Sequence, residues 1–203
     1  MSKKINYPSA DRNKFFILEV LEKYIDKNTP AKMLEVASGT GQQAAYYATK
    51  LPNLTIQPSE YAMEMFDSIR AYAEDVPDNR VKDPIKIDAK TGPWEIDNDF
   101  DYILNVNMFH VSPFSCSVGF FKYGGQVLKN NGLIFTYGAL MIDGVIEPQS
   151  NIDFDRNIRA RDPSCGLRDI RDLQKLAAEN GITLKHMYDL PANNKCCVWV
   201  KNG

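Results

Sequence analysis

Short apolar runs of the buried-strand type recur along the chain, and segments with a helical spacing of apolar residues lie before and between them. The strand-like runs are 33–37, 54–58, 84–88, 100–106 and 132–137. The helix-like segments are 15–24, 44–48, 63–73 and 117–128. Strands separated by helices in this order predict an α/β fold with a parallel sheet that is covered by helices on both faces.

The last third of the chain departs from this alternation. A helix is expected over 170–180, followed by Gly181 at the position after its last turn. Two strand-like runs, 183–190 and 196–201, are then separated only by the turn-forming residues 191–194. Because a parallel crossover needs a dozen or more residues, these two strands must be antiparallel neighbours.

Composition indicates an ordinary globular protein in one domain, residues 1–203. With 44% hydrophobic and 25% charged residues, the chain can bury a core without disulfide or metal staples. No repeat or low-complexity linker divides it. The net charge of −2, with no basic cluster, argues against a nucleic-acid partner.

The sequence shows neither an apolar signal segment at its start nor the run of about 20 apolar residues needed to span a membrane. Its 4 cysteines and 2 histidines lack the spacing of a zinc site, so no metal is expected. Cys196 and Cys197 should point to opposite faces of one strand. We therefore expect reduced thiols in a cytoplasmic protein, whereas the oligomeric state is not indicated.

A nucleoside site is predicted where the first strand meets the next helix, in the segment 35–41, Glu-Val-Ala-Ser-Gly-Thr-Gly. Small residues there let the backbone approach a ligand, and the helix N-terminus offers free N–H groups. Glu60 ends the following strand, where a carboxylate can accept both ribose hydroxyls. Asp88 ends the third strand, at the same sheet edge and within reach of an adenine ring.

The motif Gly-x-Gly-x-x-Ala at 39–44 fits both a dinucleotide and S-adenosylmethionine. Three observations favour S-adenosylmethionine. Glu35 lies inside the strand, where a methyltransferase uses an acid to orient the loop and the methionine end. No second half-domain is available for a nicotinamide. The only pair with hydride-transfer spacing, Tyr46 and Lys50, lies on the helix after the loop and is interpreted as a helix face.

Motifs along nearly the whole chain resemble those of the methyltransferase-like 26 group of class I S-adenosylmethionine-dependent methyltransferases. They lie at 12–14, 34–42, 57–60, 107–113, 137–138, 150–155, 161–163, 166–169 and 191–194. The resemblance implies a Rossmann-like class I methyltransferase fold, with a mostly parallel seven-stranded sheet and an antiparallel C-terminal strand. It also implies bound S-adenosylmethionine, but it identifies no acceptor.

The chain departs from the family pattern at three positions. Gln43 stands where the family commonly has His, and Phe114 and Cys165 stand where it usually has Trp. Cys165 removes an aromatic wall of the acceptor pocket and indicates a shifted substrate.

The residues predicted to hold the donor combine these arguments. They are Arg12, Asn13, Glu35, Ala37, Ser38, Gly39, Thr40, Gly41, Glu60, Asp88 and Asn105. Arg12 and Asn13 are included because the family match implies that their segment folds over the cofactor. The alternative for that segment is an ordinary helix start capped by Asp11 or Asn13.

The predicted catalytic residues are Asn107 and His110, in the loop after the fourth strand. Methyl transfer from a sulfonium is an in-line displacement in which alignment supplies much of the rate. The Asn107 amide could orient the methionine end or the acceptor. His110, with an unperturbed pKa of about 6.5, could serve as a general base. Its alternative is a hydrogen-bonded structural histidine.

The polar connection 144–166 is long for a compact domain, and such loops often form lids. Arg161 and Arg168 could grip an anionic acceptor bidentately, with Asn151 and Tyr137 also on the substrate side. The alternative is an exposed, salt-bridged connector.

The leading hypothesis is a methyltransferase for a small-molecule acceptor, because the chain has neither an appended recognition domain nor a basic face. Two alternatives remain open. One is a non-catalytic binder of S-adenosylmethionine or S-adenosylhomocysteine, and the other is an NAD-linked oxidoreductase.

Overall fold

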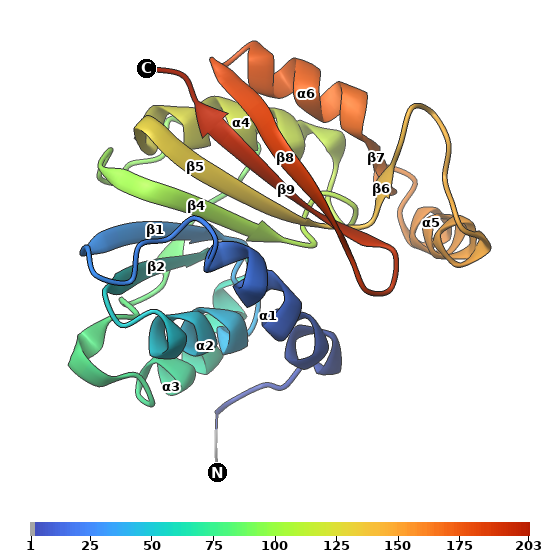
Figure 1. Ribbon diagram of the computed structural model, residues 1–203. Coiled ribbons are helices and arrows are strands. Elements are labelled where there is room, and N and C mark those ends of the chain that lie inside the picture. The colour runs from blue at the N-terminus through green and yellow to red at the C-terminus, as the bar shows by residue number, and fades with distance from the viewer. Residues whose placement is uncertain (1–2) are drawn as a thin grey trace.

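The computed structural model describes residues 3–203 and is built on a seven-stranded sheet (Figure 1). The strand order is β3-β2-β1-β4-β5-β9-β8. The strands are β1 (Ala31–Val36), β2 (Leu54–Glu60), β3 (Ile85–Lys86), β4 (Phe100–Val106), β5 (Leu128–Gly138), β8 (Ile182–Leu190) and β9 (Asn194–Lys201). The first five in this order pair in parallel, whereas β9 runs antiparallel to both β5 and β8. This arrangement confirms the predicted fold class.

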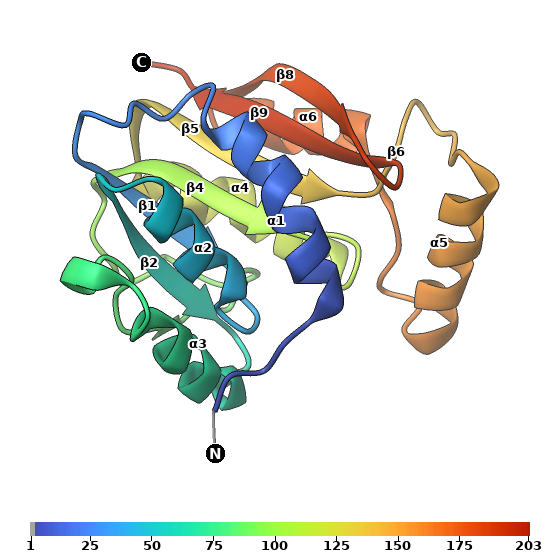
Figure 2. The ribbon, with the colours of Figure 1, turned by 60° about the horizontal axis from the view of Figure 1, so that its bottom comes forward.

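Helices cover both faces of the sheet. On one face lie α1 (Pro8–Leu21) and α2 (Gln42–Lys50), with α3 (Phe66–Ala73) beside α2 (Figure 2). On the other lie α4 (Phe114–Val127) and α6 (Ile170–Ala178). Each face of the sheet has its own apolar core, and successive residues of a strand point to opposite faces. Cys197 is therefore buried in the core under α4 and α6, whereas Cys196 is buried in the core on the α1 side.

Between β5 and α6 the structure contains a helix, α5 (Gln149–Arg161), in the connection for which the sequence predicts a lid or a connector loop. Periodicity could not reveal it, because Asn151 is its only buried residue. Charge pairs one turn apart, such as Asp155 with Arg159, support it instead. Two short strands, β6 (Leu140–Met141) and β7 (Arg168–Asp169), pair in parallel on either side of it.

The start of α1 also differs from the prediction. The helix begins at Pro8, with Tyr7 as its N-cap, so that Asp11 and Asn13 lie inside the helix and cap nothing. Proline suits the first helical position because its ring already has a helical φ and it lacks the N–H that would be unsatisfied there. The apolar periodicity starts only at Phe15, about two turns later, and therefore predicts the helix start too late.

Close packing of α4 fixes the segment after β3. A Cβ on Gly119 would lie 2.0 Å from the carbonyl oxygen of Ala89. Gly119→Ala must therefore push α4 away from this segment, and we expect a loss of about 1–3 kcal/mol in the free energy of unfolding, measured by urea denaturation. The matched control is Gly124→Ala in the same helix, where the new Cβ would make ordinary contacts at 3.4 Å or more. Equal urea midpoints for the two variants would contradict this prediction.

Candidate functional site

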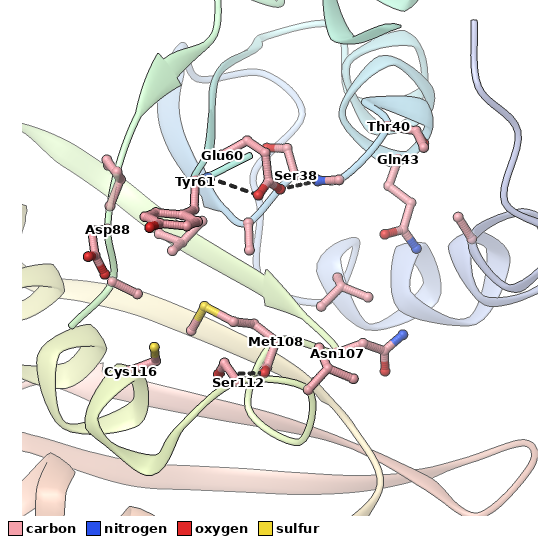
Figure 3. A pocket seen from close by; sticks show the side chains of 18 of the residues that line it. Ser38, Thr40, Gln43, Glu60, Tyr61, Asp88, Asn107, Met108, Ser112 and Cys116 are labelled. Atoms are coloured by element: carbon pink, nitrogen blue, oxygen red, sulfur yellow. Dashed lines mark hydrogen bonds between the residues drawn. The ribbon is translucent and has the colours of Figure 1, made fainter. Parts of the chain in front are cut away.

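A cavity of about 550 Å³ opens at the carboxyl ends of β1, β2 and β4 (Figure 3). It is lined by the start of α1, the end of β1 with the loop that follows, the start of α2, the end of β2, the segment after β3, the end of β4 with the loop that follows, and the start of α4. The predicted site residues that line it are Ala37, Ser38, Gly39, Thr40, Glu60, Asp88 and Asn107. The structure thus brings most of the predicted nucleoside residues together.

The loop between β1 and α2 is held in a conformation that needs its glycines. Gly39 and Gly41 have φ of +56° and +87°, and Ala37 also has a positive φ of +60°. A Cβ on Gly41 would lie 2.7 Å from the Cα of Ile69, so α3 could not pack so closely against any other residue there. Such backbone strain is common at ligand sites.

The carboxylate of Glu60 is fixed at the cavity wall by three backbone N–H groups (Figure 3). Gly39 N donates to Oε2 at 2.8 Å, and Tyr61 N and Ala62 N donate to Oε1 at 2.8 and 3.2 Å. Oε1 thus already accepts two bonds and Oε2 accepts one, so Oε2 has a free acceptor site, and the longer bond from Ala62 N is the one that a second ligand hydroxyl would replace.

Asp88 lies on the same side of the cavity as Glu60, two residues beyond the end of the short strand β3. Its Oδ1 accepts a bond from Lys90 N at 3.1 Å, and its Oδ2 lies 3.8 Å from Lys90 Nζ. Met108 and Cys116 project nearby (Figure 3). An acceptor beside apolar side chains suits an aromatic ring that carries an amino group.

Glu35 lies behind the loop and does not line the cavity. Its side chain is buried, and Oε2 has no hydrogen-bond partner among residues 3–203. Burial, with a smaller contribution from the charge of Glu60, raises the pKa of Glu35 to about 7. The pKa of Tyr47 is also raised, first by burial and then by the charge of Glu35.

The other predicted donor residues lie outside the lining. Asn105 is buried, and its Nδ2 donates to Val36 O at 2.9 Å, which ties β4 to the end of β1. Gly41 is the N-cap residue of α2 and does not line the cavity. Arg12 and Asn13 lie on α1 beyond the residues of that segment that do face the cavity.

His110 and Asn107 occupy different sides of the loop after β4. Asn107 lines the cavity, with φ of +64° and its N donating to Tyr137 O at 2.8 Å. The buried His110 ring packs edge-on against Phe154, 5.3 Å between centroids, and lies outside the lining. Burial, followed by the charge of Arg168, lowers the pKa of His110 to about 4. The imidazole is therefore neutral and weakly basic, unlike the unperturbed group assumed from the sequence.

The predicted substrate residues do not line this cavity. Arg168 is buried, and its guanidinium donates to the carbonyl oxygens of Phe109, Ser112 and Ser164, which joins the loop after β4 to the turn after α5. Asn151 donates to Glu147 O and Asn193 O. The remaining two are Tyr137, whose pKa burial raises to about 12, and Arg161, which is exposed at the end of α5.

Several cavity residues were not predicted from the sequence: Tyr7, Ser9, Ala10, Gln43 and Tyr61. Gln43 and Tyr61 directly follow the motifs at 34–42 and 57–60, so their position in the sequence was a signal that could have identified them. No local pattern could bring Tyr7, Ser9 and Ala10 to the cavity, because their position depends on how α1 packs over α2.

Within residues 3–203, no group of three or more His, Cys, Asp or Glu side chains could hold a metal ion. No helix there is long and apolar enough to cross a membrane. The four cysteines are buried and unpaired.

The fold is that of class I methyltransferases. A protein assigned as a sarcosine dimethylglycine methyltransferase from Galdieria sulphuraria matches with a TM-score of 0.75 at 16% identity, over 98% of this chain and 92% of that one. Human N-acetylserotonin methyltransferase, solved with SAM, gives 0.75 at 14% identity over 94% and 52%. CalO1, a methyltransferase of calicheamicin biosynthesis solved with SAH, gives 0.76 at 17% over 95% and 54%. The chain thus spans about half the length of the last two.

Residues 4–201 match the model of the family described as "Protein of unknown function (DUF938)". The chain belongs to this family.

Proposed function

We propose that this protein binds S-adenosylmethionine and transfers its methyl group to a small-molecule acceptor. The observation that carries the proposal is the cavity itself, in which a glycine loop at the carboxyl edge of the sheet lies beside the fixed carboxylates of Glu60 and Asp88. This is the place where open α/β sheets bind nucleosides.

The residues present fit the adenosyl group. Glu60 would accept bonds from the two ribose hydroxyls, and Asp88 would accept from the adenine amino group. Apart from Gly39 and its two neighbours in the chain, no heavy atom lies within 4 Å of a Cβ built on Gly39, so the loop leaves room for the sugar. When bound, S-adenosylmethionine supplies an electrophilic methyl group on its sulfonium.

Positioning is the main task left to the protein in such a transfer. Asn107, which lines the cavity next to the end of β4, would orient the reacting groups through its amide. We assign His110 to holding the loop after β4 against Gly138 and Phe154, because its ring faces them and its pKa is low. Arg168 would hold the same loop from the other side, whereas Arg161 remains the candidate for contact with an anionic acceptor.

A small acceptor is supported by the nature of two structural neighbours, which are named for methylation of N-acetylserotonin and for calicheamicin biosynthesis. The sequence motifs further support membership of the methyltransferase-like 26 group. We also propose that residues 1–203 act as one domain and work in the cytoplasm, where buried, unpaired cysteines stay reduced.

Thermal unfolding with added ligands tests the proposal. S-adenosylhomocysteine at a hundredfold excess over its Kd should stabilise the protein by about 2.7 kcal/mol, which raises Tm by roughly 5–10 °C for a chain of this size. NAD at the same concentration should cause little change. A larger shift with NAD would replace this function by that of an oxidoreductase. Incorporation of labelled methyl from S-adenosylmethionine into a metabolite extract should then separate a transferase from a non-catalytic binder.

A further inference from the structure

The cavity is polarised from one end to the other. The charged residues that line it, Glu60, Asp88 and Lys90, are grouped at the end formed by the segments after β2 and β3. Within residues 3–203, no charged side chain lines the opposite end, where α1 and α2 begin. That end presents hydrogen-bond donors instead.

The first donors are backbone N–H groups of α1. The first hydrogen bond in this 14-residue helix runs from Asp11 N to Tyr7 O, which leaves the N–H groups of Ser9 and Ala10 without a helical acceptor. Both residues line the cavity. The helix dipole adds partial positive charge there. Asp11 lies in the same turn, but its carboxylate is occupied by Lys14 at 2.7 Å and Asn6 at 2.6 Å.

A second, independent donor is the side chain of Gln43, in the first turn of α2. Gln43 is only 7% exposed and lines the cavity, yet its Nε2 has no partner among the described residues. Figure 3 shows its amide projecting from α2 into the space between Thr40 and Asn107. A buried amide without a partner carries a free-energy cost, which a bound acceptor would remove. The neighbouring Gln42 differs, because its Oε1 accepts from Tyr7 N and Thr40 Oγ1.

We propose that Gln43 and the first turn of α1 bind the carboxylate at the amino-acid end of the donor, so that the protein distinguishes S-adenosyl amino acids from simpler thioether nucleosides. This inference rests on the proposed function and deepens it. A ligand with hydroxyl and amino donors at one end and an anion at the other matches the polarity of the cavity.

The first turn of α1 is held in place over this end by the segment that precedes it. Tyr7 N donates to Gln42 Oε1 at 2.6 Å and Ile5 N donates to Ser68 Oγ at 2.9 Å, while Lys3 pairs with Asp67. Segment 3–10 is therefore bonded to α2 and α3, as Figure 2 shows it running past them to α1. Its donors are fixed before a ligand arrives.

Calorimetric titration of three ligands tests the inference: S-adenosylhomocysteine, its decarboxylated analogue, which keeps the amine, and 5′-methylthioadenosine, which lacks the whole amino-acid end. Gln43→Met keeps the side-chain length and removes the amide. It should weaken S-adenosylhomocysteine binding by roughly tenfold or more, as expected for a lost hydrogen bond to a charged group. The affinities of the other two ligands should stay unchanged.

Gln57→Met is the matched control, because the Gln57 amide bonds to Pro58 O and Asp83 O and does not line the cavity. It should leave all three affinities unchanged. Equal effects of Gln43→Met on the three ligands would overturn the carboxylate assignment, as would wild-type affinities that do not depend on the carboxylate. Failure of the wild type to bind even S-adenosylhomocysteine would instead overturn the proposed function on which the inference rests.

Discussion

Replacing Glu60 by alanine is expected to weaken the binding of S-adenosylhomocysteine by at least about a hundredfold. The side chain would lose two bonds to the ribose hydroxyls, each worth about 1.5–3 kcal/mol because the acceptor is charged. It would also release the N–H groups of Gly39, Tyr61 and Ala62, which the carboxylate now holds. Both effects act on the same end of the cavity, and calorimetric titration measures their sum.

Two further variants serve as controls, one for the charge of Glu60 and one for the loss of a carboxylate elsewhere on the protein. Glu60→Gln keeps an oxygen acceptor without the charge and should fall between the wild type and Glu60→Ala. Glu64→Ala removes an exposed carboxylate from the turn before α3 and should leave the affinity unchanged. Wild-type affinity in Glu60→Ala would show that the nucleoside does not lie against this carboxylate.

Glu35→Gln should make the stability of the protein less sensitive to pH. Burial raises the pKa of Glu35 from 4.5 to about 7 in the folded protein. Between these values the folded state keeps a proton that the unfolded state releases, so the free energy of unfolding falls as pH rises, by about 1.4 kcal/mol per unit. The stabilisation is complete below about pH 4.5 and lost above about pH 7, a total of about 3 kcal/mol.

Glutamine has no proton to lose, so the free energy of unfolding of the variant should not show this pH dependence. Relative to the wild type, it should be about 3 kcal/mol more favourable at pH 8 than at pH 5. The corresponding gain in Tm is roughly 6–12 °C for a chain of this length. Urea or thermal unfolding at the two pH values measures it, and Glu64→Gln on the surface supplies the reference. A difference between Glu35→Gln and wild type that is the same at both pH values would mean that Glu35 titrates alike in the folded and unfolded chain.

Elements that bury a periodic apolar face could be predicted from the sequence. β4 and β5 were recognised because their apolar runs are buried within a parallel sheet, and the β8–β9 pair was recognised from its short turn. α5 could not be recognised, because a helix with a single buried residue has no apolar stripe. The two-residue strands β6 and β7 are too short to have any period.

The end of the cavity that we propose for the nucleoside could be predicted because it is formed by strand ends. Residues that follow parallel strands meet at one sheet edge, which brings Glu60, Asp88 and the glycine loop to the same cavity. The directions of individual side chains were not predictable in the same way. His110 and Asn107 are three residues apart, yet only Asn107 lines the cavity, since the backbone turn between them sends the His110 ring towards α5.

The bonds of segment 3–10 to α2 and α3 have a practical consequence for protein production. An affinity tag or fusion partner placed ahead of Lys3 would lie beside α3, where Lys3 pairs with Asp67, and would strain the segment whose bonds hold the start of α1 at the cavity. Gly203 is exposed at the opposite end of the molecule (Figure 1), so a tag attached there would leave the site undisturbed.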